Sequence, residues 1–214
     1  MLLLTGCDGS ESQPSFSYLA LGDSYTIGQS VEEDQRWPVQ LAAELGNQGV
    51  SVRPPIIVAR TGWTTTALMN AIENDDNLGN QYDMVSLLIG VNNQFQGRSV
   101  ESFVPEFEAL LQRSIRLAGN NPQRVFVLSI PDYGVTLFGS SRGPFVSRSI
   151  DEYNAVVEAT CKEYQVRYFN ITPISREAAS DLALLASDNL HPSGKMYKRW
   201  VDLIAADVKQ LLIE

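Results

Sequence analysis

The stretch "YLALGDSYTIG", residues 18–28, decides the fold of this chain. It begins with four apolar or aromatic residues, which is typical of a short strand buried in a sheet. The strand breaks at Gly22, and the chain then presents Asp23 and Ser24. A core strand that ends in one acid and one serine needs an explanation, and the rest of the sequence supplies it.

Further apolar runs alternate with helical patterns along the chain. The short runs rich in Val, Ile and Leu lie at residues 17–22, 55–60, 84–90, 124–130 and 166–171. The helical patterns lie at residues 37–49, 64–74, 100–111 and about 149–165, and after Pro192-Ser193. Strands that alternate with helices predict right-handed crossovers and a parallel sheet covered on both faces. We therefore predict an α/β fold, a three-layer α/β/α sandwich around a five-stranded parallel sheet.

The length and composition fit one domain with a single core. The chain has 214 residues, of which 44% are hydrophobic and 19% charged, enough apolar surface for one well-packed domain. Because Asp and Glu outnumber Lys and Arg by 25 to 16, the net charge is -9, and nucleic acid would repel it. We therefore predict one domain over residues 17–214 and no nucleic-acid partner.

Residues 1–16 differ in composition from the rest. The run "LTGC", residues 4–7, resembles the end of a bacterial lipoprotein signal, in which Cys7 is lipidated and becomes the mature N-terminus. The apolar run ahead of it is too short for a secretory signal, so this interpretation expects further signal residues upstream; the alternative is a start-site remnant. Residues 8–16 are rich in Ser, Gly and Pro, as flexible tethers are. We predict a signal remnant and tether, a possible membrane anchor at Cys7, and an extracytoplasmic location, in the periplasm or at the cell surface.

Polar residues follow the predicted strands at the point where each strand ends. Ser24 follows the first strand, Gly62 the second, Asn92 the third, and the pair Asp188 and His191 comes after the fifth. Open α/β sheets place their sites beyond the carboxyl ends of the strands. We therefore expect these five residues to share one rim of the sheet.

The residue types on this rim are those of a serine hydrolase. A serine hydroxyl needs a base within hydrogen-bond reach, and His191 is the only histidine in the chain. Asp188, three residues earlier, can hold the useful tautomer of the imidazole. A single histidine near a helix start is more often a cap or a surface residue, but beside Asp188 and opposite Ser24 the catalytic interpretation is favoured.

The same rim offers donors for a developing oxyanion. The backbone N–H groups of Ser24 and Gly62 and the side-chain amide of Asn92 could supply three hydrogen bonds. Taken singly, Gly62 could serve only a tight turn and Asn92 only a cap. Their order along the rim favours an oxyanion hole.

With these blocks in place, the chain resembles the GDSL, or SGNH, hydrolase family of esterases and lipases over residues 17–205. The four signature residues of the family would be Ser24, Gly62, Asn92 and His191. The resemblance implies a flavodoxin-like five-stranded sheet between helices, an enzyme that needs no cofactor, and a serine that is acylated. His191 would act first as base and then as acid.

Two positions depart from the family pattern. Tyr25 stands where the family name has a leucine, which alters the wall of the site and leaves the chemistry alone. The third block usually reads Gly-x-Asn-Asp, but Asn93 occupies its last position here. An acid that braces this loop in the family is therefore missing.

Two other motifs compete with this interpretation. Residues 139–143 match the G-x-S-x-G nucleophile elbow around Ser141, but that elbow must join a strand directly to a helix. Because the nearest predicted strand ends at residue 130, we expect Ser141 in a mobile loop, residues 132–147, that borders the site. The acidic stretch at residues 73–79 lacks the spacing of a calcium loop, and one histidine with two unrelated cysteines predicts no metal site.

We therefore predict a serine-dependent carboxylic-ester hydrolase that acts on a small ester through an acyl-enzyme. The alternatives are a carbohydrate O-deacetylase of the same fold and a non-catalytic surface binding module. Tyr133 and Phe138 favour an acyl chain or aryl group, whereas Trp63 could stack on a sugar; Asn93 is a further candidate for substrate contact. The oligomeric state is left open.

Overall fold

The structure is a computed structural model that describes residues 15–213. A five-stranded parallel sheet forms its centre. Its strands are β1 (Tyr18–Gly22), β2 (Ile56–Ala59), β3 (Met84–Leu88), β4 (Val125–Leu128) and β5 (Arg167–Phe169). They pair in the order β2-β1-β3-β4-β5, every pair parallel. The predicted fold is confirmed. The strand order changes direction between β1 and β3, which is where open sheets of this kind place their sites.

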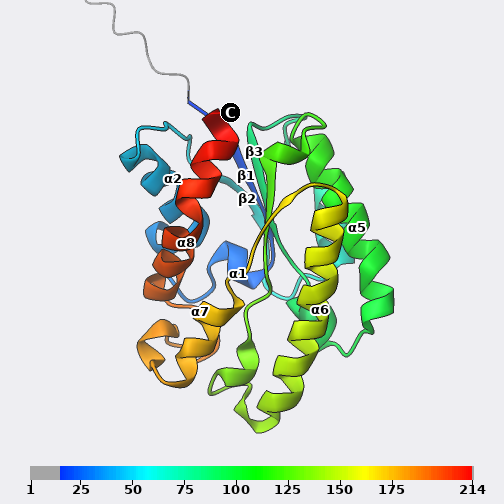
Figure 1. Cartoon of the computed structure of the whole chain (residues 1–214), viewed down its shortest axis with the longest axis vertical. Coiled ribbons are helices and arrows are strands. Elements are labelled where there is room, and N and C mark those ends of the chain that lie inside the picture. The colour runs from blue at the N-terminus through cyan, green and yellow to red at the C-terminus, as the bar shows by residue number, and fades with distance from the viewer. Residues whose placement is uncertain (1–14, 214) are drawn as a thin grey trace, which may run out of the picture.

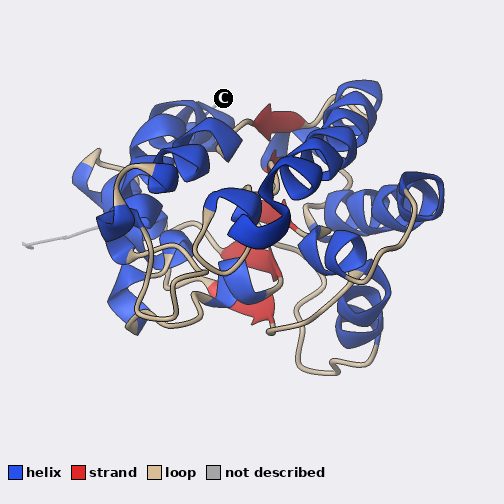
Figure 2. Ribbon diagram, turned by 90° about the horizontal axis from the view of Figure 1, so that it is seen from below, coloured by secondary structure: helices blue, strands red, loops and turns tan. Residues whose placement is uncertain are grey.

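Helices cover both faces of this sheet (Figures 1 and 2). They are α1 (Ser24–Ile27), α2 (Trp37–Asn47), α3 (Thr65–Glu73), α4 (Val91–Phe95), α5 (Val100–Leu117), α6 (Gly143–Glu163), α7 (Thr172–Arg176) and α8 (Gly194–Ile213). Helices α2 and α8 pack together on one face, and α5 packs between α3 and α6 on the other (Figure 1). The short α1 and α4 start directly beyond β1 and β3, so they sit at the carboxyl edge of the sheet.

The apolar runs of the sequence form strands that lie in the hydrophobic core. Every residue of β1, β3 and β4 is buried, because helices cover both sides of these central strands. Trp37 and Trp200 fill the layer on the α2–α8 side, and Phe103 and Phe107 of α5 are buried as well. Strand β2 lies at the edge of the sheet, and its Ile56 is exposed.

One expectation about the loop after β4 is wrong. Residues 132–147 do not form a continuous loop, because they contain two 3-10 turns (Tyr133–Val135 and Ser140–Arg142), and α6 already begins at Gly143. The helix therefore starts before residue 149. Pro144 lies in its first turn, where the missing N–H has no helical partner to lose.

The predictions for the N-terminus fall largely outside the described residues. Cys7 and residues 8–14 of the predicted tether are not covered by the structure, so the lipid anchor and the extracytoplasmic location stay predictions. Within residues 15–213, no helix is both long enough and apolar enough to cross a bilayer.

Candidate active site

A cavity of about 260 Å³ opens at the carboxyl edge of the sheet, the edge that faces the reader in Figure 2. Ser24, Gly62, Asn92 and His191 all line it, although they come from four separate segments of the chain. The structure thus brings together the residues that follow three different strands with the single histidine. Asp188 reaches the cavity through its contact with His191.

Ser24 reaches the cavity because β1 ends at a glycine. A Cβ atom on Gly22 would lie 2.2 Å from the hydroxyl of Thr26 and 2.6 Å from the carbonyl oxygen of Leu88, so no larger residue fits there. The chain turns at once into α1, and the side chain of Asp23 caps this helix by accepting the N–H of Tyr25 at 3.0 Å. This turn answers the question raised by the opening stretch: the acid caps the helix, and the serine is presented to the cavity.

Asp23 itself is fully buried beneath the site. Burial raises the pKa of its carboxyl group to about 7, although the hydrogen bond from the Tyr25 backbone acts in the opposite direction. Its second oxygen, Oδ2, has no hydrogen-bond partner among the described residues. The side chain does not line the cavity, and its contacts are those of a structural cap.

Asp188 and His191 form the acid–histidine pair that their spacing predicts. Nδ1 of the His191 ring lies 2.7 Å from Oδ2 of Asp188. The other oxygen, Oδ1, accepts the backbone N–H groups of Leu190 and His191 at 3.0 and 2.9 Å. The tilted ring of Tyr25 packs 5.5 Å from the imidazole, centroid to centroid, so the tyrosine that replaces the family leucine helps to hold His191. The structure records no hydrogen bond between Ser24 and His191, and such bonds often tighten only when substrate binds.

Ser30 is a member of the site that the sequence did not reveal. Its hydroxyl donates to Oδ2 of Asp188 at 2.6 Å, the same oxygen that faces the histidine ring. Partial burial raises the pKa of Asp188, but the hydrogen bonds from Ser30, His191 and Leu190 outweigh it and bring the value down to about 2. No sequence motif predicts this contact, because the two residues are 158 positions apart. The one local sign is the left-handed backbone of Ser30, φ 67°, which only the structure shows.

Removal of the Ser30 hydroxyl should weaken this stabilisation. In Ser30→Ala we expect the pKa of Asp188 to rise from about 2 toward the ordinary value of about 3.9, because a hydrogen bond to the charged form is lost. Titration of the Asp188 carboxyl carbon by NMR measures it. Ser30→Gly is the matched control, since it also relieves the positive φ; both variants should give the same shift. An unchanged pKa of Asp188 would show that the hydroxyl makes no contribution.

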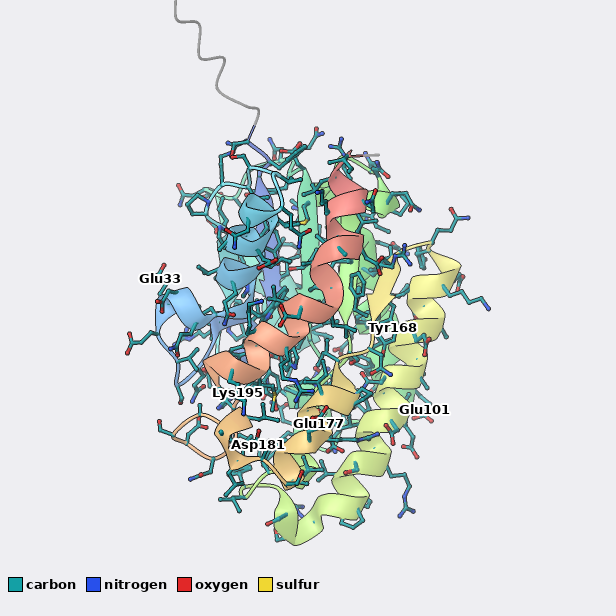
Figure 3. All side chains as sticks on the ribbon, turned by 60° about the vertical axis from the view of Figure 1, so that its left-hand side comes forward. Glu33, Glu101, Tyr168, Glu177, Asp181 and Lys195 are labelled. Atoms are coloured by element: carbon teal, nitrogen blue, oxygen red, sulfur yellow. The ribbon has the colours of Figure 1, made fainter. Side chains whose placement is uncertain are left out.

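The segment that leads to His191 is fastened to the start of α8. Lys195 pairs with Asp181 at 2.7 Å, and Arg199 makes two hydrogen bonds, 2.7 and 2.8 Å long, to Glu177 (Figure 3). These pairs are largely exposed, so each contributes little to the free energy of unfolding. They nevertheless connect the turns before His191 to the helix after it.

Ser24, Gly62 and Asn92 line the cavity, and each of them has a hydrogen-bond donor that could serve a ligand. Within residues 15–213, no hydrogen bond uses the backbone N–H of Ser24 or Gly62, and both residues line the cavity. Asn92 donates one amide hydrogen to the carbonyl of Trp63 at 2.9 Å, which leaves its second hydrogen for a ligand. Gly62 has a φ of 81°, which only glycine adopts without strain. Ser24, Gly62 and Asn92 thus each retain a hydrogen-bond donor beside this cavity.

Two of the four expected substrate contacts do not reach the cavity. Asn93 is completely buried, and its side-chain amide is taken up by Thr65 and Glu106, so the expectation of a substrate contact there is wrong. The side chain of Trp63 packs against the hydrophobic core and does not line the cavity. The position of Trp63 beside Gly62 predicts stacking on a sugar, but the side chain is partly buried against the core.

Aromatic side chains form the other wall of the cavity. Tyr133 and Phe138 line it as expected, and Phe95 of α4 joins them, with its ring 6.0 Å from that of Tyr133 and 6.3 Å from that of Phe138. Ser141 lines a separate cavity of about 110 Å³ on the far side of these aromatic residues. It lies in a 3-10 turn rather than at a strand-to-helix elbow. Among the described residues, no group of three or more His, Cys, Asp or Glu side chains could hold a metal ion.

Comparison with known proteins identifies what this arrangement resembles. The model of the GDSL-like lipase/acylhydrolase family matches residues 20–199. None of the curated protein sequences matches the chain. Among solved structures, a lipase/acylhydrolase from Enterococcus faecalis superposes with a TM-score of 0.71 and 18% identity over 91% of this chain and 96% of that one. A phospholipase A1 from Streptomyces albidoflavus superposes with a TM-score of 0.69 and 19% identity over 92% of this chain and 100% of that one. An acetylxylan esterase from Geobacillus stearothermophilus superposes with a TM-score of 0.69 and 18% identity over 90% of this chain and 94% of that one. At these identities the likeness shows the fold alone.

Proposed function

The chain belongs to the GDSL-like lipase/acylhydrolase family, and we propose that it is a serine-dependent carboxylic-ester hydrolase that works through an acyl-enzyme. One observation carries this proposal: Ser24, the Asp188–His191 pair, two backbone N–H groups without a partner among the described residues and the amide of Asn92 lie at one cavity. A nucleophile, a base with its orienting acid and an oxyanion hole are the parts that acyl transfer needs.

The first half of the reaction acylates the serine. Nε2 of His191 takes the proton of the Ser24 hydroxyl while Oγ attacks the carbonyl carbon of the ester. The negative charge that develops on the carbonyl oxygen is met by the N–H groups of Ser24 and Gly62 and by the amide of Asn92. The tetrahedral intermediate then collapses, and the imidazolium gives its proton to the departing alcohol oxygen.

The second half releases the acid. Water enters the place of the alcohol, and His191 removes a proton from it as the water oxygen attacks the acyl carbon. The tetrahedral intermediate then collapses, and the imidazolium gives its proton to Oγ of Ser24 as the carboxylic acid leaves. Asp188 stays ionised throughout, because the hydrogen bonds that it accepts bring its pKa to about 2. It holds Nδ1–H toward itself and so keeps Nε2 free to accept a proton.

The cavity wall supports an apolar group on the substrate. Phe95, Tyr133 and Phe138 lie on one side of the cavity, and Val91 and Leu190 also line it. An acyl chain that enters this space buries methylene groups, each contributing about 0.8 kcal/mol, or roughly fourfold in kcat/KM at most. We therefore propose esters of short to medium acyl chains in preference to acetylated sugars.

A series of p-nitrophenyl esters tests this preference. We expect kcat/KM to rise by about two- to fourfold per methylene from acetate to butyrate and then to level off as the cavity fills. Phe138→Ala should flatten this rise, because Phe138 lines the cavity. Phe145→Ala is the matched control, since that exposed ring does not line it and should leave the series unchanged.

The alternative substrate class has its own outcome in the same experiment. One structural neighbour is an acetylxylan esterase, so acetylated xylo-oligosaccharides are the natural competitor. A fall in kcat/KM beyond acetate, together with faster release of acetate from the sugar, would favour a carbohydrate O-deacetylase and overturn the acyl-chain preference.

A further inference from the structure

The short helix α4, which carries Asn92 and Asn93, is braced by an acid from another helix. The family pattern has an aspartate after this asparagine, but the chain has Asn93. In the structure Glu106, on the second turn of α5, brings a carboxylate to the side chain of Asn93. The acid is therefore not lost from the site; it arrives from the side of α5 instead of from the residue after Asn92.

The contacts around Asn93 form a closed network. Its side-chain oxygen accepts the backbone N–H of Thr65 at 3.1 Å, and its Nδ2 donates to Oγ1 of Thr65 at 2.7 Å and to Oε2 of Glu106 at 3.3 Å. The hydroxyl of Thr65 also donates to Oε2 of Glu106. Arg98 completes the network, with its guanidinium 3.5 Å from the same oxygen. Asn93 and Thr65 are both fully buried, so each of these partners matters.

This network joins the two segments that carry the proposed oxyanion donors. Thr65 is only three residues from Gly62, and Asn93 is the neighbour of Asn92. The hydrogen bond from Asn92 to the carbonyl of Trp63 joins the same two segments on the cavity side. The two segments are thus joined twice, and at the inner contact the carboxylate of Glu106 accepts hydrogen bonds from both Asn93 and Thr65.

We propose that Glu106 is a positioning residue for the oxyanion hole, and that Asn93 and Glu106 form an acid–amide pair whose carboxylate comes from α5 instead of from the residue after Asn92. The proposal rests on the proposed esterase function. Glu106 does not touch the substrate; it acts through Asn93 and Thr65 on the alignment of Asn92 and Gly62. Its loss should therefore lower kcat more than it raises KM.

Exchange of the two partners gives the sharpest test. Asn93→Asp alone would place two carboxylates about 3.3 Å apart, and they would repel each other once both are ionised. At any pH at which wild type is active, kcat of Asn93→Asp should therefore be lower than that of wild type by about tenfold or more. Arg98 and Tyr153, the other ionisable groups that face Glu106, stay in place. In Asn93→Asp/Glu106→Gln the acid and the amide are both present again, so kcat should return to within about threefold of wild type at every pH.

Single variants and a control complete the experiment. Glu106→Ala should lower kcat by about 10- to 100-fold, less than the 10²–10³-fold expected for loss of a whole oxyanion donor. Glu101→Gln removes a carboxylate from the exposed first turn of the same helix and should change kcat by less than twofold (Figure 3). A double variant no better than Asn93→Asp, or an unchanged kcat in Glu106→Ala, would overturn the proposal.

The same variants also report when no ester is turned over. Thermal unfolding should show the same pattern, with Asn93→Asp destabilised and the double variant restored, because Asn93 and Thr65 are buried. An inactive wild type with this stability pattern would refute the esterase proposal and leave the acid–amide pair intact. An active wild type whose Glu106 and Asn93 variants show no coupling in kcat or in stability would refute the acid–amide pair and leave the esterase proposal intact.

Discussion

Ser24→Ala should lower kcat for p-nitrophenyl acetate by about 10⁶-fold, the loss found when a nucleophile is removed from a serine hydrolase. Among the described residues, no second serine lines this cavity, because Ser141 lines a different cavity on the far side of Phe95, Tyr133 and Phe138. The His191–Asp188 pair and the oxyanion donors would remain. They should leave a rate about 10³–10⁴-fold above that of the uncatalysed reaction in water, since these groups still bind and polarise the ester.

The matched control is Ser141→Ala, which should keep full activity. Both variants should unfold at the wild-type temperature, because Ser24 makes no side-chain hydrogen bond recorded in the described part of the chain and Ser141 is exposed. A fluorophosphonate reagent should label wild type and Ser141→Ala but not Ser24→Ala, since only an activated serine reacts. Loss of activity in Ser141→Ala would instead identify the nucleophile elbow as the site. Absence of labelling in wild type would support a binding module.

The parts of this site that follow a strand could be predicted from the sequence, and the parts that depend on distant packing could not. Ser24, Gly62 and Asn92 come directly after apolar runs, and parallel strands bring their carboxyl ends to one edge whatever the helices do. Asp188 and His191 are three residues apart, so a local turn decides their contact.

Ser30 and Glu106 belong to the second kind. The contact of Ser30 with Asp188 spans 158 positions, and it exists because two loops at one edge of the sheet meet. Glu106 lies on an amphipathic helix, where an acid at a partly exposed position is ordinarily a solvated charge. The partial burial of Trp63 likewise depends on how the loop after β2 packs against the core.

The predicted start of α6, at about residue 149, is wrong for a local reason. Gly143 and Pro144 favour a loop in the sequence, because glycine and proline most often interrupt regular structure. Proline is also compatible with the first turn of a helix, and here that second role applies. Tyr133 and Phe138 of the aromatic wall therefore belong to a segment of 3-10 turns that leads directly into a long helix, not to a continuous loop.

Asp188→Asn should lower kcat by up to about 10⁴-fold with little change in the fold. The two backbone N–H groups of Leu190 and His191 point at Oδ1, so the asparagine must keep its oxygen there and turn its NH₂ toward the histidine. An NH₂ group donates, and Nδ1 of His191 must then accept. The ring would carry its proton on Nε2, the tautomer that cannot take a proton from Ser24.

The chain allows this tautomer to be observed directly, because it has one histidine. Nitrogen NMR should show the proton on Nδ1 in wild type and on Nε2 in Asp188→Asn, and the loss of kcat should accompany that change. Ser30→Ala separates the acid from its support: it leaves the carboxylate in place, so the proton should stay on Nδ1 and the loss of kcat should be far smaller. An Asp188→Asn variant within tenfold of wild-type kcat would mean that His191 is oriented by something other than this carboxylate, and the 2.7 Å contact would then be structural only.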